Sequence, residues 1–456
     1  MNILNKLILL IIFTSIVVPA QNSQERIKVI GDSLVGKVVN GESIREIYGN
    51  VKLTQGNVFV TCNKAVQYLV RNDAVLEGNV IVKRDSITIT TSKGFYLGDE
   101  KITKSTSGIV LDDKKVVLVA DSGEYFFNED KAFLQSRVSL KDSVMKMFAD
   151  ELTYYQKENR VVSVGNVKII DPSNEINADS LEHFRTSKTS IADGHVKIVS
   201  LENNSMIFGD HLEDYPERNY TLINENPLYM QFDSTYSDDY ELTVDTLLIK
   251  AGLMEAFRDS ANIFKAVDSV KIVKGEFASV NDFTLFLRDE DIIITKKLPD
   301  KLNQPVLWYI NSQLSGDSIT IYIAEKNINR LDVNHNAFML SQNKKYKERF
   351  DQTSAKDVNL FFANNKLSRA DFIESVLSIY YLYEDEVANG LTKSSAKKVI
   401  IVFENDEVNQ VRLYGSPQSD FYPENQVSGN EKAFTLPAFK FYKYRPTSNE
   451  LLKSIN

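Results

Sequence analysis

The chain has 456 residues, of which 43% are apolar and 25% are charged, and these fractions are typical of a folded protein rather than a disordered one. The formal net charge is −9 and the isoelectric point is about 5.3, which argues against a nucleic-acid binder because such proteins usually present a basic face. Cys62 is the single cysteine, so the composition excludes an internal disulfide and disfavours a structural zinc site.

The first twenty residues have the features of an export signal. Lys6 precedes an apolar run from Leu7 to Val18, and small residues precede a cleavage site after Ala20. The run is too short to span a bilayer comfortably, so we interpret residues 1–20 as a cleaved signal peptide. The alternative is a membrane anchor that is retained at the N-terminus.

A repeat of about 29 residues follows, and two markers define it. The first marker is a glycine in text such as "YGNV" and "EGNV", found at Gly49, Gly78, Gly108, Gly165 and Gly194, with Arg137 near the place where one glycine is missing. The second marker is a polar residue in text such as "ADSLEHF", found at Asn63, Ser92, Asp121, Asp150, Asp179 and Asp210, with Asp32 as a further copy. Two markers in phase indicate stacked units, because one such unit cannot bury its apolar face alone.

Each repeat predicts two β-strands and polar corners. In residues 76–92, apolar and polar side chains alternate in two short runs, and "RDS" between them is polar enough to turn the chain. We expect the marker glycine or the asparagine after it to form a corner before a strand, because both residues accept the positive φ of a tight reversal. The predicted fold class is therefore all-β, an elongated solenoid, roll or folded sheet.

The alternation of "GNV" with text of the form "ADxLxY" resembles the OstA-like family, whose members are periplasmic proteins that carry lipopolysaccharide toward the outer membrane. The resemblance covers residues 27–215 and is looser over 216–456, where "GDSITIYI" and "AKDVNLFF" echo the strand text at irregular spacing. In that family the repeats form an elongated β-jellyroll, which is compared with a folded taco. The resemblance thus implies a repeat β-jellyroll over 21–225 and a second, more irregular OstA-like β region over 226–456.

Three stretches of the second half have less regular text. Residues 367–386 could form a helix by composition, but Ile379-Tyr380-Tyr381 and the resemblance favour a strand. Residues 298–312 hold two prolines and Trp308, and we expect an inserted loop there. The basic cluster "KKYKER", at 344–349, is expected to be a solvated loop.

The resemblance implies that the interior of the roll binds the acyl chains of lipid A. Burying one CH₂ group contributes about 0.8 kcal/mol, so an acyl chain of about 12 carbons gains on the order of 10 kcal/mol in a dry groove. The alternation of side chains suggests eight groove-facing residues, which are Val51, Leu53, Val58, Val60, Val80, Val82, Ile87 and Ile89. The alternative is that these residues pack against one another as ordinary core.

The expected partners follow from the same resemblance. They are lipopolysaccharide, and the inner- and outer-membrane proteins of its transport, which would pair with the exposed first and last strands of the roll. Head-to-tail self-association by the same edges is also expected, and proline at Val29 should weaken it. We expect a periplasmic location, possible association with the outer membrane, and no nucleic-acid partner.

Catalytic and metal-binding signals are weak. The four histidines form no spaced cluster, and no nucleophile elbow or phosphate-binding loop is present in the sequence. The aspartate series lacks the nine-residue, glycine-rich repeat of calcium-binding β-rolls. We therefore expect neither an enzyme nor a cofactor. Two rival interpretations are a structural surface solenoid or adhesin without a lipid ligand, and a polysaccharide-cleaving parallel β-helix.

Overall fold

The computed structural model describes residues 25–201, 204–236, 242–301, 303–325, 327–363, 366–404 and 407–455. The expected signal peptide lies outside these residues. The chain divides into two compact units. The first unit contains the described residues up to Lys114 together with Glu124–Glu129, and the second contains Lys115–Gly123 and the described residues from Asp130 onward. None of the helices in the described ranges has the length and apolar character that a membrane span requires.

The first unit consists of antiparallel strands. They are β1 (Lys28–Ile30), β2 (Ser33–Val39), β3 (Glu42–Gln55), β4 (Val58–Tyr68), β5 (Asp73–Arg84), β6 (Ile87–Leu97), β7 (Ile102–Ser105) and β8 (Ile109–Asp112), and β10 (Ser122–Phe126) falls on the boundary between the units. β3, β4, β5 and β6 pair in chain order. The two strands predicted within 76–92 are β5 and β6, and a turn at Asp85 joins them, as expected.

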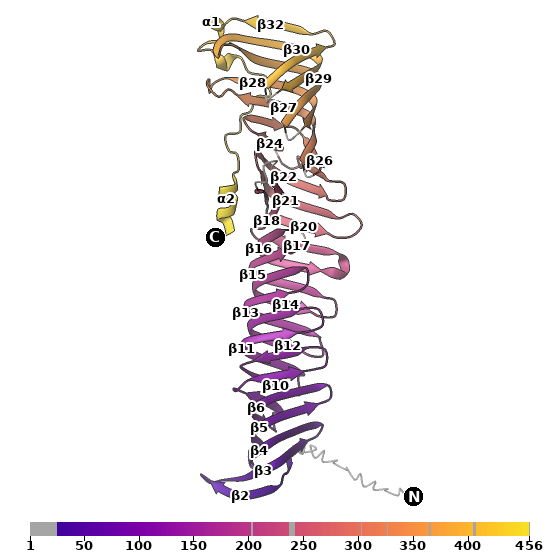
Figure 1. The fold of residues 1–456 in the computed structure, drawn as a ribbon, viewed down its shortest axis with the longest axis vertical. Coiled ribbons are helices and arrows are strands. Elements are labelled where there is room, and N and C mark those ends of the chain that lie inside the picture. Colours follow the sequence, from indigo (N-terminus) through magenta and orange to yellow (C-terminus); the bar gives the residue numbers. More distant parts are fainter. Residues whose placement is uncertain are drawn as a thin grey trace, which may run out of the picture. The chain divides into compact units, whose positions relative to one another are not determined.

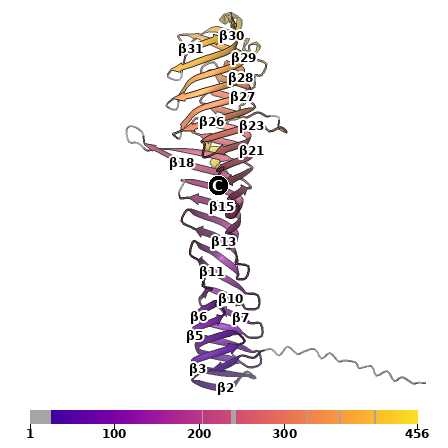
Figure 2. The ribbon, with the colours of Figure 1, turned by 90° about the vertical axis from the view of Figure 1, so that its right-hand side faces the viewer.

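The second unit contains the remaining strands, and its strands follow one another in chain order from β11 to β30 (Figure 1). They are β9 (Val117–Ala120), β11 (Lys131–Lys141), β12 (Lys146–Tyr155), β13 (Arg160–Ile170), β14 (Asn174–Phe184), β15 (Thr189–Ser200), β16 (Ser205–Tyr215), β17 (Tyr220–Asn224), β18 (Leu228–Tyr236), β19 (Leu242–Lys250), β20 (Leu253–Phe257), β21 (Ile263–Lys274), β22 (Phe277–Leu287), β23 (Ile292–Lys296), β24 (Val306–Tyr309), β25 (Ser312–Ser315), β26 (Ser318–Ala324), β27 (Asn327–Gln342), β28 (Phe350–Ala363), β29 (Lys366–Glu384), β30 (Val387–Glu404), β31 (Glu407–Tyr414) and β32 (Gln418–Tyr422). The hairpin of β18 and β19 projects from its neighbours (Figure 2).

The helices of the second unit are short. They are η1 (Pro216–Arg218), α1 (Glu424–Val427), η2 (Glu431–Ala433), α2 (Ser448–Leu452) and η3 (Lys453–Ile455). The predicted all-β fold class is therefore correct. The predicted boundary near residue 225 falls in the three-residue connection between β17 and β18, and it stays a prediction.

The expected corners are β-bulges in the middle of strands, which corrects the prediction. Gly165 and Asn166 both have positive φ, at 78° and 47°, and the register of β13 against β14 shifts between Val164 and Val167. The same pattern recurs at Gly49, Gly78 and Gly194, whereas Gly108 lies between β7 and β8. Ser136 and Arg137 occupy the equivalent position in β11, where the sequence lacks the glycine. A bulge bends its strand and leaves the pairing on either side intact, so the strand continues around a bend instead of ending there.

The second repeat marker lies beside the bulge of the following strand. Asp150 accepts a hydrogen bond from Asn166 Nδ2 at 2.7 Å, and Asp121 accepts two from Arg137, each at 2.8 Å. His195 Nδ1 lies 2.7 Å from Asp179 Oδ2. At Asp121, Asp150 and Asp179 the two markers thus belong to one structural unit, in which a carboxylate binds the second residue of a bulge on the neighbouring strand. This pairing explains why the markers keep the same spacing.

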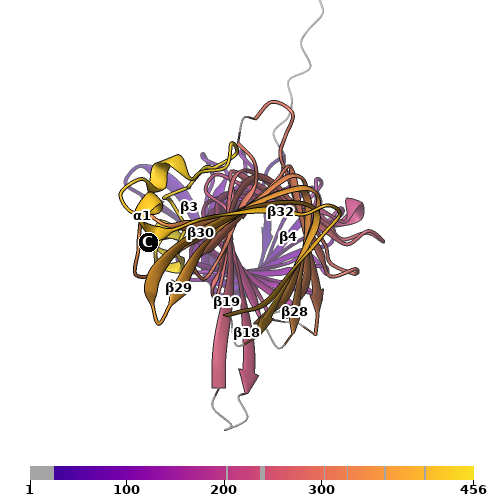
Figure 3. The ribbon, with the colours of Figure 1, turned by 90° about the horizontal axis from the view of Figure 1, so that it is seen from above.

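Because successive strands bend at equivalent places, the two halves of each strand form two walls around one interior. Figure 3, which looks along the second unit, shows β28, β29 and β30 wrapping around this interior. The hairpin turns then lie along two edges of the walls. We call them rim 1 and rim 2, and in the second unit rim 1 contains the turns at Asp142, Asn204, Gly275 and Ile310, and rim 2 those at Lys188, Asp291 and Glu325.

Two of the three predictions for the second half need correction. The strand over 367–386 is confirmed as β29. The expected loop over 298–312 contains the short strand β24 and reaches the first residue of β25, and Trp308 is buried. Arg349 in the expected solvated loop is only 3% exposed, because it binds Glu424 and Glu431.

Candidate ligand-binding interior

The eight predicted groove residues all lie on the inner face of the first unit. Leu53, Val60, Val82 and Ile89 stand directly opposite one another across β3, β4, β5 and β6. The other four, Val51, Val58, Val80 and Ile87, share the same face. Each of the eight is at most 2% exposed. The alternation therefore places them together, and whether they contact a lipid stays a prediction.

Close to this row of side chains, hydrogen bonds join the end of β3 to the end of β6 across the interior of the first unit. Gln55, at the end of β3, donates to the carbonyl oxygen of Gly98 at 2.9 Å, and the hydroxyl of Tyr96 donates to Gln55 Oε1 at 2.6 Å. The side chains of Gln55 and Tyr96 are buried, and so is Gly98, so the bonds are shielded from competing water. In the second unit, Arg185 on rim 2 binds Asp142 on rim 1 at 3.4 Å, and both side chains are largely buried. At these places the interior is closed.

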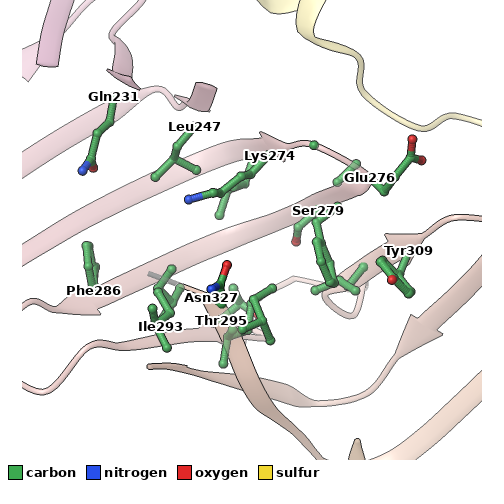
Figure 4. Close-up of a pocket in the computed structure, with 18 of the residues that line it drawn as sticks. Gln231, Leu247, Lys274, Glu276, Ser279, Phe286, Ile293, Thr295, Tyr309 and Asn327 are labelled. Carbon is green, nitrogen blue, oxygen red and sulfur yellow. The ribbon is translucent and has the colours of Figure 1, made fainter. Parts of the chain in front are cut away.

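A cavity of about 580 Å³ opens further along the second unit. This volume is typical of a small-molecule site. The apolar part of its lining consists of Phe232, Leu247, Ile272, Gly275, Phe277, Ala278, Phe286, Ile293, Leu307, Tyr309, Ile319, Ile321, Ile323, Ile328 and Phe362. The polar part consists of Asn204, Gln231, Lys274, Glu276, Ser279, Asp291, Thr295 and Asn327, several of which are labelled in Figure 4. The cavity is therefore mainly apolar, with a minority of polar groups.

Strand register explains how these side chains converge. Phe286 stands opposite Ile293, which stands opposite Ile321, so one row of side chains crosses β22, β23 and β26. Ile272 stands opposite Ser279 on the neighbouring pair of strands. The aliphatic and aromatic members of these rows are only partly buried, unlike the fully buried inner residues of the first unit. The inner face is thus partly accessible here, which is the property that an apolar ligand requires.

The mouth of the cavity lies between the two rims. Five of its lining residues are exposed, and all five lie in or beside hairpin turns: Asn204, Gly275 and Glu276 on rim 1, and Asp291 and Asn327 on rim 2. The wall residues between the rims are buried or partly buried. Four of the eight polar lining residues therefore lie at the mouth, where an amphiphile would keep its head group in water.

Lys274 and Glu276 follow one another around the tip of the β21–β22 hairpin but point in different directions. Figure 4 shows Lys274 extending toward the side of Gln231, and Glu276 pointing away from it. Lys274 belongs to the inner-facing series of β21, because it stands opposite Phe277 two positions after Ile272. A cation is thus placed at the polar edge of an apolar chamber.

Three aromatic rings bound the cavity on the side of the packed core. Phe277 and Tyr309 stack with ring centroids 4.5 Å apart, and Phe362 meets both rings edge-on, at 6.0 and 5.8 Å. Phe362 also belongs to the core cluster formed by β24–β31. The rings therefore separate the open chamber from the filled interior of β27–β30.

The family model for "OstA-like protein" matches residues 30–131. This part of the chain is an OstA-like segment. The segment contains the eight predicted groove residues, all of which lie within β3–β6. No curated protein matches the chain.

One solved structure that matches the chain is LptH from Pseudomonas aeruginosa, described as the LptA-homologous periplasmic component of the lipopolysaccharide transport device. The match has 16% identity, covers 37% of this chain and 83% of that chain, and has a TM-score of 0.13. At this TM-score the match adds nothing to the fold, which is established by the strand pairing described above.

The cavity lies outside the OstA-like segment, and none of the eight predicted residues lines it. The sequence reasoning missed its lining residues. The available signal is the alternating text of "GDSITIYI", which supplies Ile319 and Ile321, whereas Ile293 lies in the unbroken apolar run of "DIIITK", which marks no face. Alternation marks Ile319 and Ile321 as inward-facing, but it does not tell an open chamber from a filled one.

Titratable groups outside the cavity bear on two other kinds of site, a metal site and a reactive thiol. Within the described ranges, no group of three or more His, Cys, Asp and Glu side chains could hold a metal ion. Burial raises the pKa of the Cys62 thiol to about 11, so the thiol stays protonated and unreactive at neutral pH. Hydrogen bonding to Asp193 raises the pKa of His211, and this pair lies beside the bulge of β15.

Proposed function

We propose that this protein binds lipopolysaccharide through its acyl chains and carries it, in the periplasm, toward the outer membrane. The OstA-like segment supports the class of cargo, and the geometry of the interior supports the mode of binding. The observation that carries the proposal is the apolar chamber of the second unit, whose mouth opens between two rims of polar turns.

The physical basis is the transfer of acyl chains out of water. Each buried CH₂ group contributes about 0.8 kcal/mol, and this gain needs only a continuous apolar surface. The rows containing Ile272, Phe286 and Ile293 provide such a surface on paired strands. The charged sugar head would remain at the mouth, where Lys274 is suited to a phosphate group and Asn327 to a hydroxyl group.

The eight inner residues of the first unit belong to the same proposal. The bonds of Gln55 to Gly98 and to Tyr96 hold the turn after β3 against the end of β6. The eight residues would contact acyl chains once these bonds break and the two turns separate. In the closed state the eight side chains fill the interior themselves. The route of the lipid along the chain would thus alternate between open and closed segments.

We further propose that the strand edges recruit the membrane partners of transport and a second copy of this chain. All seven residues of β2 are exposed, and β2 pairs with β3 along one side. An exposed strand edge is a template for pairing with another strand. Export by the signal peptide at residues 1–20 would bring the protein to these partners.

Native mass spectrometry of residues 21–456 mixed with lipopolysaccharide tests the proposal. Ile293→Glu places a carboxylate on the cavity wall and should abolish the lipid-bound mass, because a charge cannot be buried among acyl chains without a partner. Ile294→Glu is the matched control: it lies next in the same strand, is equally partly buried, and stands in the row of Leu285 and Thr320 on the other face. This control should keep the lipid-bound mass.

Two results would reject the carrier proposal. One is a wild-type protein that stays free of lipid at every concentration while its circular dichroism remains that of a folded β protein. The other is equal loss of lipid in both variants, which would show that the lipid does not bind in the cavity. The first result would favour the structural solenoid, in which the inner residues serve only as core.

A further inference from the structure

We infer that the last part of the chain, Pro423–Ile455, is a clamp that holds one lip of the cavity mouth and slows the exchange of the bound lipid. We call this segment the C-terminal strap. The inference rests on the proposed function, because it assigns a means of control to the same cavity. It concerns a stretch that has no counterpart in the 29-residue repeat.

The strap runs back over strands that it follows by more than a hundred residues. After β32 the chain turns at α1 and returns along the outside of the second unit to α2, which lies beside β18 and β21 (Figure 1). Three buried apolar side chains fix its course. Val427 and Leu436 join a cluster with Leu340 and Ile379, and Leu451 joins another that includes Trp308.

Two buried glutamines hold the extended part of the strap to the sheet. Gln352 donates to the carbonyl oxygen of Phe434 at 3.1 Å and accepts from the amide of Leu436 at 2.9 Å. Gln313 repeats this arrangement, donating to Lys440 O at 2.8 Å and accepting from Tyr442 N at 2.9 Å. Each side chain thus takes the place of a strand neighbour for one strap segment, which fixes the register of the strap against the wall.

Arg445 then connects the strap to the mouth. Its guanidinium donates to the carbonyl oxygens of Ile310 and Glu276, each at 2.7 Å. These carbonyls belong to two neighbouring hairpin turns of rim 1, and both turns border the cavity through Glu276 and Tyr309. One side chain therefore ties together two turns whose tips lie just beyond the last paired residues, Phe277 and Tyr309.

The surroundings of Arg445 keep it in position. Thr447 caps α2 by accepting from the amide of Glu450, and Glu450 binds Lys271 of β21 at 3.0 Å. Lys271 is three residues before Lys274, so the same strand carries a strap contact on its outside and the cavity cation on its inside. A strap that only covered the outer apolar face would need Leu451 but not the bonds of Arg445 to the rim.

The test measures release of a ligand from the full mature chain. The protein is loaded with N-phenylnaphthylamine, an uncharged dye that fluoresces in apolar surroundings, and the dye is chased by dilution in a stopped-flow instrument. Arg445→Ala should release the dye about tenfold faster, which corresponds to the loss of charge-assisted hydrogen bonds from the closed state. Arg412→Ala should leave the rate unchanged, because Arg412 is an exposed arginine that binds Gln410 on β31.

A second measurement needs no ligand and separates failure of the clamp from failure of the proposed function. Hydrogen exchange of the amides in 275–277 and 310–312 should quicken in Arg445→Ala and not in Arg412→Ala. Unchanged exchange at both turns, or equal dye release in both variants, would overturn the clamp. Faster exchange in a protein that binds neither dye nor lipopolysaccharide would keep the clamp on the rim and reject the lipid cargo.

Discussion

At the scale of single residues, a buried histidine on the inner face is held neutral by its surroundings. His183 lies on the inner face of β14, directly opposite Ser190 on β15, and its Nδ1 atom is 2.9 Å from the serine hydroxyl. Burial lowers the pKa of His183 to about 4, and the positive charge of Arg185 acts in the same direction. Asp142 and Asp214 oppose the shift without reversing it. The folded protein therefore holds this imidazole neutral.

This burial predicts a loss of stability in mild acid. Below about pH 6.5 the unfolded chain binds a proton at His183, but the folded chain does so only near pH 4, so the free energy of unfolding falls as the pH drops through this window. The full loss is on the order of 3 kcal/mol. In His183→Leu the free energy of unfolding should depend less on pH between 6.5 and 4, as measured by urea denaturation. An unchanged difference between pH 7 and pH 4.5 would show that His183 is solvated.

At the scale of the elements, a β-bulge bends the strand of a repeat while its pairing with the neighbouring strands continues. The first bulge residue needs positive φ, and in β13 it also passes close to a neighbouring carboxylate: a Cβ atom on Gly165 would lie 2.5 Å from Asp150 Oδ2. The same carboxylate accepts from Asn166. Glycine is thus required here for two reasons, conformation and space.

Replacement of this glycine should therefore weaken the fold. Gly165→Ala should lower the free energy of unfolding by about 1–2 kcal/mol, because a left-handed conformation is costly with a side chain. It should also displace Asp150. Gly36→Ala, in the exposed strand β2, is the control, since a Cβ atom there meets nothing within 4 Å. Equal urea midpoints for both variants would contradict this role of the bulge.

The sequence predicts the strands of the repeat but not its bulges. Apolar alternation is local, so it locates β5 and β6 and places Val82 and Ile89 on one face. Positive φ is equally compatible with a turn and a bulge, and only the partner strand distinguishes them. For this reason the sequence predicts a corner at residue 49, although Gly49 lies within β3.

The cavity and the strap were not predicted for a related reason. Ile293 and Ile321 look like core in the sequence, and the distance between the two walls, which no local pattern encodes, makes them a chamber lining. The strap depends on Gln313 and Gln352, whose partners lie 127 to 129 and 82 to 84 residues away. Polar residues in strand text carry no signal for such distant contacts.

At the scale of the whole molecule, assembly would depend on the exposed edge of the first unit. β2 carries apolar side chains that are unusually open to solvent, including Val38 at 72% and Leu34 at 50% exposure. The side chains of positions 34 and 38 lie on one face of the strand. An edge of this kind is a site of strand pairing unless charges protect it.

Charges on this edge should reduce association without harming the fold. The double variant Leu34→Lys, Val38→Lys is expected to shift self-association to at least about tenfold higher protein concentration, a change that corresponds to about 1.4 kcal/mol. Analytical ultracentrifugation over a concentration series measures the effect. Val387→Lys is the control, since Val387 is 63% exposed at a hairpin turn. Unchanged self-association in the double variant would remove β2 from the interface.

The bulges with their carboxylate partners also limit how such a chain can change its length. In the second unit, Ser136, Gly165 and Gly194 begin bulges at intervals of 29 residues, and each following bulge residue finds its own aspartate one strand away. Loss or duplication of one whole interval would give every remaining bulge a partner. Loss of any other number of residues would place an aspartate beside a strand segment without a bulge, where it would lack its hydrogen-bond donor. Related chains should therefore differ in the length of this repeat region by whole multiples of 29 residues.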